Sequence, residues 1–206
     1  MPVGAYEQPG SSSARPWVEG VRVKDREVDA VADAGRSVRV FVGSAVAVVV
    51  AGVVALVSHQ PWLFPSLGPA IMLHMEKPRA PESSPRHTLI GHAVALLAGY
   101  GMLALCGLTG HRSVLEEGVS PVRIVAAAGS LAVTAVVLLL VKASHPPAGA
   151  TTLIVSLGLL HTPVQLAVAA GAVVLVTAVD WVFNQVTGEP MPMWSAATAP
   201  EGARHE

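Results

Sequence analysis

Charged and aromatic residues are scarce in this sequence, and it contains a single cysteine. Charged side chains make up 13% of the 206 residues and aromatic ones 4%, whereas soluble domains carry about 25% charged residues. The one cysteine, Cys106, excludes an internal disulfide. The charges cluster at the two ends and in two loops, and nothing indicates nucleic-acid binding. This composition favours a chain embedded in a lipid bilayer.

Long apolar stretches are abundant instead. A membrane-spanning helix needs about 20 mostly apolar residues. Three stretches meet this test and a fourth is uncharged until Asp180; they are Val40–Val57, Leu89–Leu108, Val122–Val141 and Val164–Phe183. We therefore expect an all-α polytopic membrane domain over residues 37–186. Residues 1–36 and 187–206 are polar, so we expect disordered tails there.

Two short apolar segments between the long ones form a weak internal repeat. Each begins with proline and glycine and continues for about ten residues, at Pro65–Met75 and Pro147–Leu157. Ten helical residues rise about 15 Å, half the hydrocarbon thickness of a bilayer. Proline suits the first turn of a helix, so we expect half-helices whose N-termini start at depth. The predicted fold is four full transmembrane helices plus two half-helices, in a 3+3 pseudo-repeat.

The distribution of lysine and arginine indicates that both half-helices cross the membrane. If they cross, six of eight basic residues near the membrane lie on the N-terminal side; if they turn back, each side receives four. Basic residues concentrate on the cytoplasmic side, so we expect crossing, inverted repeats and cytoplasmic termini. We also expect the plasma membrane of a bacterium, and a homo-oligomer because six short segments enclose little space.

A polar, proline-broken joint follows the third long segment. The run from Ser144 to Thr151, Ser-His-Pro-Pro-Ala-Gly-Ala-Thr, resembles the signature of the HPP family of integral membrane proteins. The stretches Pro65–Ala70 and Pro85–His92 also resemble segments of that family, and the resemblance covers roughly residues 41–184. It implies four transmembrane helices. Because some plant plastid and cyanobacterial relatives are associated with nitrite transport, it also implies a small anion as substrate.

The two half-helix N-termini form the predicted binding site. A helix N-terminus presents unpaired N–H groups and about half a positive charge, and both favour anions. Hydroxyl groups and close backbone approach at glycine would complete the site. The predicted binding residues are Ser66, Gly68, His92, His145, Pro146, Pro147, Ala148, Gly149, Thr151 and Thr152. The sequence thus predicts a transporter or channel for a small monovalent anion such as nitrite, not an enzyme, with no metal or cofactor.

Several alternatives stay open. His145 either carries the proton of a proton-coupled pathway or caps the broken backbone, and His92 either joins the site or makes a core hydrogen bond. For His74 we expect a role as C-terminal dipole partner. For Asp180 we expect an interfacial anchor, with a gate or a partner for Lys142 as its functional alternative. The alternatives to transport are a non-transporting sensor or scaffold module and a histidine-ligated membrane metalloprotein.

Overall fold

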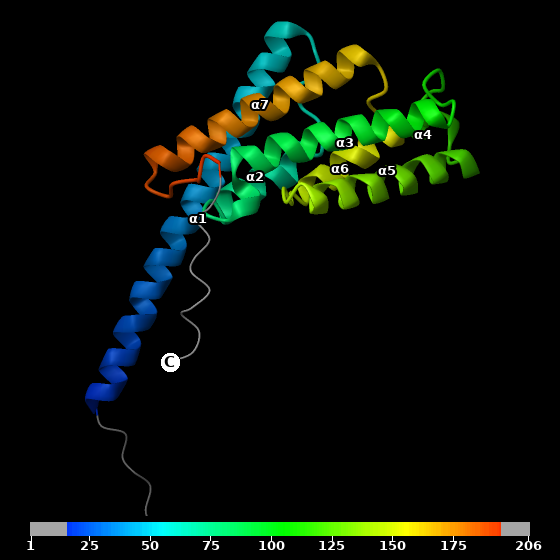
Figure 1. The fold of residues 1–206 in the computed structure, drawn as a ribbon. Coiled ribbons are helices and arrows are strands. Elements are labelled where there is room, and N and C mark those ends of the chain that lie inside the picture. Colours follow the sequence, from blue (N-terminus) through cyan, green and yellow to red (C-terminus); the bar gives the residue numbers. More distant parts are fainter. Residues whose placement is uncertain (1–15, 195–206) are drawn as a thin grey trace, which may run out of the picture. The chain divides into compact units, whose positions relative to one another are not determined.

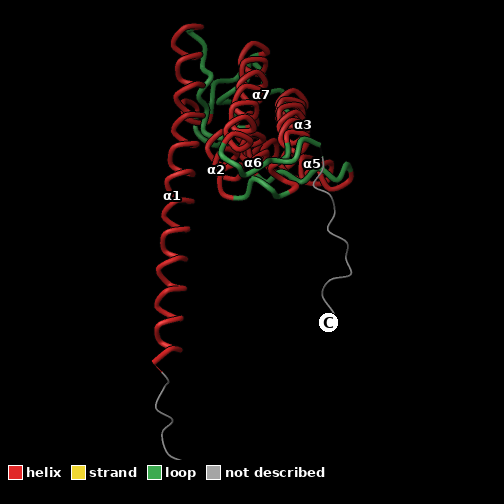
Figure 2. The backbone as a smooth tube through the Cα atoms, turned by 90° about the vertical axis from the view of Figure 1, so that its left-hand side faces the viewer, coloured by secondary structure: helices red, strands yellow, loops and turns green. Residues whose placement is uncertain are grey.

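The computed structural model describes residues 16–194, with side chains from residue 33 onward, and every regular element in this range is a helix (Figure 1; Figure 2). The elements are α1 (Pro16–Ser58), α2 (Leu67–Glu76), a single 3₁₀ turn η1 (Pro81–Ser83), α3 (Pro85–Leu105), α4 (Val114–Glu117), α5 (Pro121–Leu140), α6 (Pro147–Ser156) and α7 (Pro163–Val186). Four of them are long and apolar enough to cross a membrane: α3, α5, α7 and α1 from Asp33 onward. The predicted all-α polytopic fold is confirmed. Residues up to Val38 and residues from Arg39 onward form two separate units, and the candidate site lies in the second.

Three of the long helices begin at a proline that follows a capping hydroxyl residue. The side chains of Ser84, Ser120 and Thr162 each accept a hydrogen bond from a backbone N–H in the first turn of α3, α5 and α7. Proline fits the position after the cap because its missing N–H would have no partner there. Each cap contributes about 1 kcal/mol, so local sequence sets where these helices begin.

The core of the second unit lies where α1, α2, α3, α6 and α7 pack together. It contains small residues that let helices approach closely, together with larger apolar side chains, among them Ala47, Ala51, Leu103, Val155, Ala172 and Val176. Large apolar residues also cover the outward faces. Leu97 and Leu139, for example, are 76% and 77% exposed. An apolar exterior is what a helix bundle surrounded by lipid requires.

The segment that contains α2 runs back along α1. Near the start of the α1 span, Gly43 packs against the side chain of Met75, which lies at the end of α2. Further along α1, a Cβ at Gly52 would lie 3.5 Å from Leu63, which precedes α2. The chain from Leu63 to Met75 therefore runs antiparallel to α1 between Gly52 and Gly43, first without regular structure and then as a ten-residue helix.

The segment that contains α6 runs parallel to α3. Gly91 near the start of α3 lies against His145, and Gly99 two turns later lies against Val155. Gly91 and Gly99 are both buried, and small residues at these positions allow the two helices to pack closely. α6 also has ten residues, as predicted for both half-helices.

Hydrogen bonds at the two ends of the unit fix the directions of the remaining helices. At one end, here called the Arg39 end, Arg39 donates to Asn184 of α7, and Arg86 of α3 donates to the carbonyl of Lys142 just after α5. At the other, the Arg123 end, Arg123 of α5 donates to the carbonyl of Arg112. The part of α1 in this unit and α3 thus start at the Arg39 end, and α5 and α7 start at the Arg123 end. Both half-helix segments run from one end of the unit to the other, and the two sets of three segments run in opposite directions, as an inverted repeat requires.

Both predicted tails differ from expectation where the structure describes them. α1 begins at Pro16, so residues 16–36 are helical, because extending a helix that is already nucleated costs far less than starting one. After α7, residues 187–194 fold back. Met191 is buried, its carbonyl accepts from Gln185, and Glu189 pairs with Arg79 at 3.1 Å. Residues 1–15 and 195–206 lie outside the described residues.

Candidate functional site

The two half-helices meet through a short chain of buried hydrogen bonds. Ser66 is the residue that precedes α2, and Thr151 lies in the second turn of α6. The hydroxyl of Thr151 donates to Oγ of Ser66 at 2.7 Å, and Nδ1 of His92 on α3 lies 2.7 Å from Oγ1 of Thr151. All three side chains are at most 1% exposed. The structure therefore brings together three residues of the predicted set from three different segments.

His145 occupies the centre of the unit, next to this chain. Its Nδ1 lies 2.9 Å from the backbone carbonyl oxygen of Glu82, so it ties the joint before α6 to η1. Its ring centroid is 5.1 Å from that of His92, in an edge-to-face arrangement, and 6.1 Å from that of His74. Nε2 of His92 and Nε2 of His145 are both buried without a hydrogen-bond partner. Buried polar atoms of this kind are rare in native proteins and point to a missing partner.

His74 and Asp180 form a buried pair that our sequence interpretation misses. Both side chains are fully buried, and Nδ1 of His74 lies 2.7 Å from Oδ2 of Asp180. Nε2 of His74 lies 2.9 Å from Oγ1 of Thr88. His74 is thus not merely a partner of the helix dipole. Asp180 is neither an interfacial anchor nor a partner of Lys142, which is exposed. The available signal was that Asp180 is the one acidic residue within the last apolar stretch.

The backbone N–H groups at the half-helix N-termini are already paired, contrary to expectation. The residues before the two helices, Ser66 and Pro146, have helical backbone angles of φ −74°, ψ −10° and φ −52°, ψ −36°. The first N–H groups of each helix consequently donate to carbonyls three residues back. Pro69 in the first turn of α2 and Pro147, the first residue of α6, carry no N–H. The helix dipoles remain, and most hydrogen bonds to a ligand would come from side chains.

The other predicted residues lie around this cluster rather than in it. The hydroxyl of Thr152 donates to the carbonyl of Ala148 and lies 3.0 Å from the hydroxyl of Thr134 on α5. Ala148 and Pro147 are buried in the joint. A Cβ at Gly68 would meet nothing within 4 Å, so close backbone approach is not the reason for glycine there.

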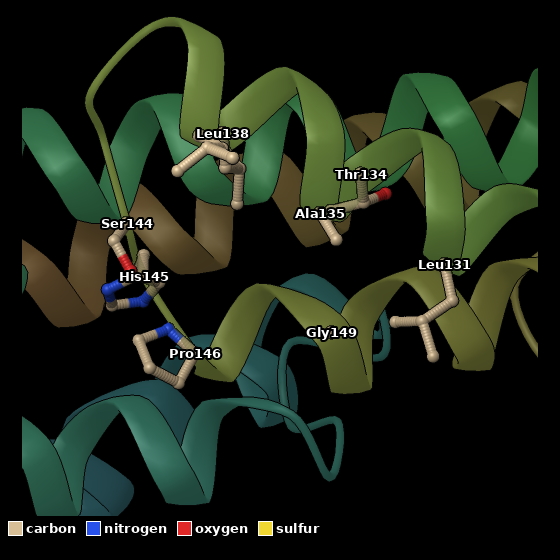
Figure 3. Close-up of a pocket in the computed structure, with 9 residues that line it drawn as sticks. Leu131, Thr134, Ala135, Leu138, Ser144, His145, Pro146 and Gly149 are labelled. Atoms are coloured by element: carbon tan, nitrogen blue, oxygen red, sulfur yellow. The ribbon is translucent and has the colours of Figure 1, made fainter.

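Two cavities flank the His-Pro-Pro joint. One, of about 390 Å³, lies between α5 and α6 (Figure 3). It is lined by Leu131, Thr134, Ala135, Leu138, Leu139, Ser144, His145, Pro146 and Gly149. The other, of about 430 Å³, lies between α2 and α6 and reaches from Pro146 and Pro147 to Lys77 at the Arg39 end. Together they give the joint two approaches from outside the unit.

The hydrogen-bond partners of the three buried histidines limit the chemistry of the cluster. The hydrogen-bond partners of His74, His92 and His145 are a carboxylate, two hydroxyl groups and a backbone carbonyl, and none is a lysine or arginine. Among the side chains that the structure describes, from residue 33 to 194, no group of three or more His, Cys, Asp or Glu is arranged to hold a metal ion.

The helices, their directions and the buried polar centre define a polytopic integral membrane protein. The model of the HPP transmembrane region matches residues 30–192. The chain therefore belongs to the HPP transmembrane family, as the His-Pro-Pro run predicts. No curated protein and no solved structure matches it.

Proposed function

We propose that this protein transports a small monovalent anion of the nitrite type and is not an enzyme. The observation that carries the proposal is the buried chain Ser66–Thr151–His92, which joins the N-terminal ends of the two half-helices next to two unpartnered imidazole nitrogens. Broken helices that meet inside an inverted repeat form the binding sites of many secondary transporters.

The local electrostatics favour an anion at this point. Each helix N-terminus carries about half a positive charge, and the N-terminal ends of α2 and α6 approach each other at Ser66 and Thr151. The hydroxyl of Ser66 accepts from Thr151, which leaves its own hydrogen to donate to a ligand. Because no lysine or arginine bonds to this cluster, an anion held there would be bound weakly enough to leave.

The sidedness proposed for the protein follows from its basic residues. Arg39, Lys77, Arg79, Arg86 and Lys142 belong to the Arg39 end, whereas Arg112 and Arg123 belong to the opposite end. By the positive-inside rule, we place the Arg39 end in the cytoplasm of a bacterium. We further propose that the protein works as a homo-oligomer, because the two cavities beside the joint open to the exterior of the unit.

The test is anion exchange by the purified full chain in liposomes. Isotopically labelled nitrite, nitrate, formate and chloride would be offered outside vesicles that contain the same unlabelled anion at equal pH. We expect exchange of at least one, and a drop of about tenfold or more in Thr151→Val, because without the Thr151 hydroxyl Ser66 is no longer held with its own hydrogen free for the ligand. One hydrogen bond to a charged ligand contributes about 1.5–3 kcal/mol.

Thr187→Val is the matched control, since that hydroxyl donates to a carbonyl at the exposed end of α7. It should leave exchange unchanged. If the wild-type protein exchanges none of the four anions, the transport proposal fails and a sensor or scaffold role becomes the better account.

A further inference from the structure

The hydrogen bonds around His92 and His145 determine where their ring protons lie. The hydroxyl hydrogen of Thr151 is directed at Ser66, so Thr151 can only accept from Nδ1 of His92. The partner of Nδ1 of His145 is the backbone carbonyl of Glu82, which can also only accept. Both rings therefore carry their proton on Nδ1. In the neutral state, Nε2 of each ring is a bare lone pair, and both atoms are buried without a partner.

The unshared electron pairs of the two Nε2 atoms repel an anion, and protonation of either nitrogen reverses this effect. Once either Nε2 is protonated, that ring becomes a cation with a free N–H donor inside the cluster. A neutral acid that brings its own O–H group would satisfy the same nitrogen as a hydrogen-bond acceptor. In both cases the occupied site contains one proton more than the empty site, so anion occupancy and proton occupancy are linked by geometry.

The charges around the two histidines also require a proton to accompany the anion. His74 and Asp180 share a proton: Thr88 donates to the carbonyl of Ser84 and thus accepts from Nε2 of His74, which leaves one proton between Nδ1 and the carboxylate. That pair is neutral overall. An anion that entered alone would therefore be an uncompensated buried charge, which is costly.

Among the described residues, no other charged side chain hydrogen-bonds to this cluster, and the buried Arg123 donates to the carbonyl of Arg112 at the opposite end. Arg39 on α1 is held by Asn184 and by the carbonyl of Met75, and α6 carries no charged residue. The remaining charged or titratable groups near the joint lie at its rim, exposed or half-buried; they are Glu76, Lys77, Glu82, Arg86, His87 and Lys142.

We propose that His92 and His145 form a proton-binding pair, so that the anion moves through this protein together with one proton and without net charge. The proposal deepens the proposed function and depends on it. The ligand is a small anion together with one proton. During transport that proton is carried either by the histidine pair or by the anion itself.

The experiment measures proton movement during nitrite uptake. Liposomes that contain the full-length protein and a pH-sensitive dye receive an inward nitrite gradient, with potassium and valinomycin present to hold the membrane potential at zero. Nitrite can then enter with or without a proton, and initial rates are corrected with protein-free liposomes. We expect acidification of the interior in step with nitrite uptake. We also expect a pH gradient of one unit to drive about tenfold accumulation.

The double variant His92→Gln/His145→Gln should lose at least nine-tenths of the protein-dependent acidification. His161→Gln is the matched control, since His161 lies in the loop before α7 and its Nδ1 contacts the carbonyl of Gly158. Acidification that persists in the folded double variant would overturn the proposal.

Measurements on the wild-type protein decide the matter even if the double variant does not fold. Nitrite uptake without acidification would overturn the proton pair and leave transport standing. Absence of exchange for all four anions at equal pH would overturn both proposals.

Discussion

Adding one methyl group at Gly91 should displace His145. A Cβ at this position would lie 2.8 Å from Cβ of His145 and 3.2 Å from two atoms of its ring. The first contact is with the atom next to the backbone, so rotation of the side chain cannot relieve it. Overpacking of this kind costs about 1–3 kcal/mol. We therefore expect Gly91→Ala to lower the free energy of unfolding and to weaken proton-linked anion uptake.

Gly101→Ala on the same helix is the matched control. Its Cβ would meet nothing within 4 Å. Alanine is a better helix former than glycine by about 1 kcal/mol, and this gain applies to both variants, so it cancels in their difference. The expected difference between Gly91→Ala and Gly101→Ala is therefore the overpacking cost alone, about 1–3 kcal/mol.

The assay is reversible unfolding in mixed detergent micelles, followed by circular dichroism, with anion exchange measured on the same preparations. Gly101→Ala should be as stable as the wild type or slightly more so, and fully active. Equal stability and equal exchange in the two variants would refute the close packing of His145 on Gly91, and with it our description of the joint.

Three further predictions concern the Arg39 end and the buried pair. Arg39→Met should lower the free energy of unfolding by about 1–3 kcal/mol, because it leaves Asn184 and a backbone carbonyl without their donor. Asp180→Leu should destabilise the protein by a similar amount in the same unfolding assay, because His74 loses its buried partner. Lys77→Cys, combined with Cys106→Ala, should react with an impermeant maleimide only in inside-out vesicles.

Each of these predictions has its own contradicting result. Arg79→Met removes a pair whose arginine side chain is 67% exposed and should cost no more than about 1 kcal/mol; an equal effect of Arg39→Met would mean that its buried contacts do not form. If Asp180→Leu is as stable as the wild-type protein, the buried contact between His74 and Asp180 does not form. Labelling of the Lys77→Cys variant in right-side-out cells would reverse the proposed orientation.

Local sequence determines much of this fold. Helices begin at Pro85, Pro121 and Pro163 because proline and the extended residue before it restrict the backbone within a few residues. The ten-residue length of the half-helices can also be predicted, because glycine and proline interrupt the apolar pattern on both sides. Directions follow from the count of basic residues. None of these inferences requires knowledge of which helix faces touch.

The chemistry of the site depends on contacts that sequence does not reveal. His74 and Asp180 are 106 positions apart, and they meet only because α2 packs on α7 in one particular rotation. The expected free N–H groups at Leu67, Gly68, Ala148 and Gly149 are absent because Ser66 and Pro146 adopt helical angles, which let these groups donate to carbonyls three residues back. Of the predicted set, Ser66, His92 and Thr151 form one hydrogen-bonded chain, whereas Gly68 faces open space.

The crossing of the half-helix segments has a consequence for how the chain enters the membrane during synthesis. α1 and α3 run in the same direction, and so do α5 and α7, although each pair is consecutive among the four long helices. An insertion machinery that recognised only long apolar helices would alternate their directions and would place α3 upside down. Residues 59–76 must therefore return through the bilayer before they can find their hydrogen-bonding partners. Reporter fusions that truncate the chain after α3 should show mixed orientations, which resolve only when the second repeat has been made.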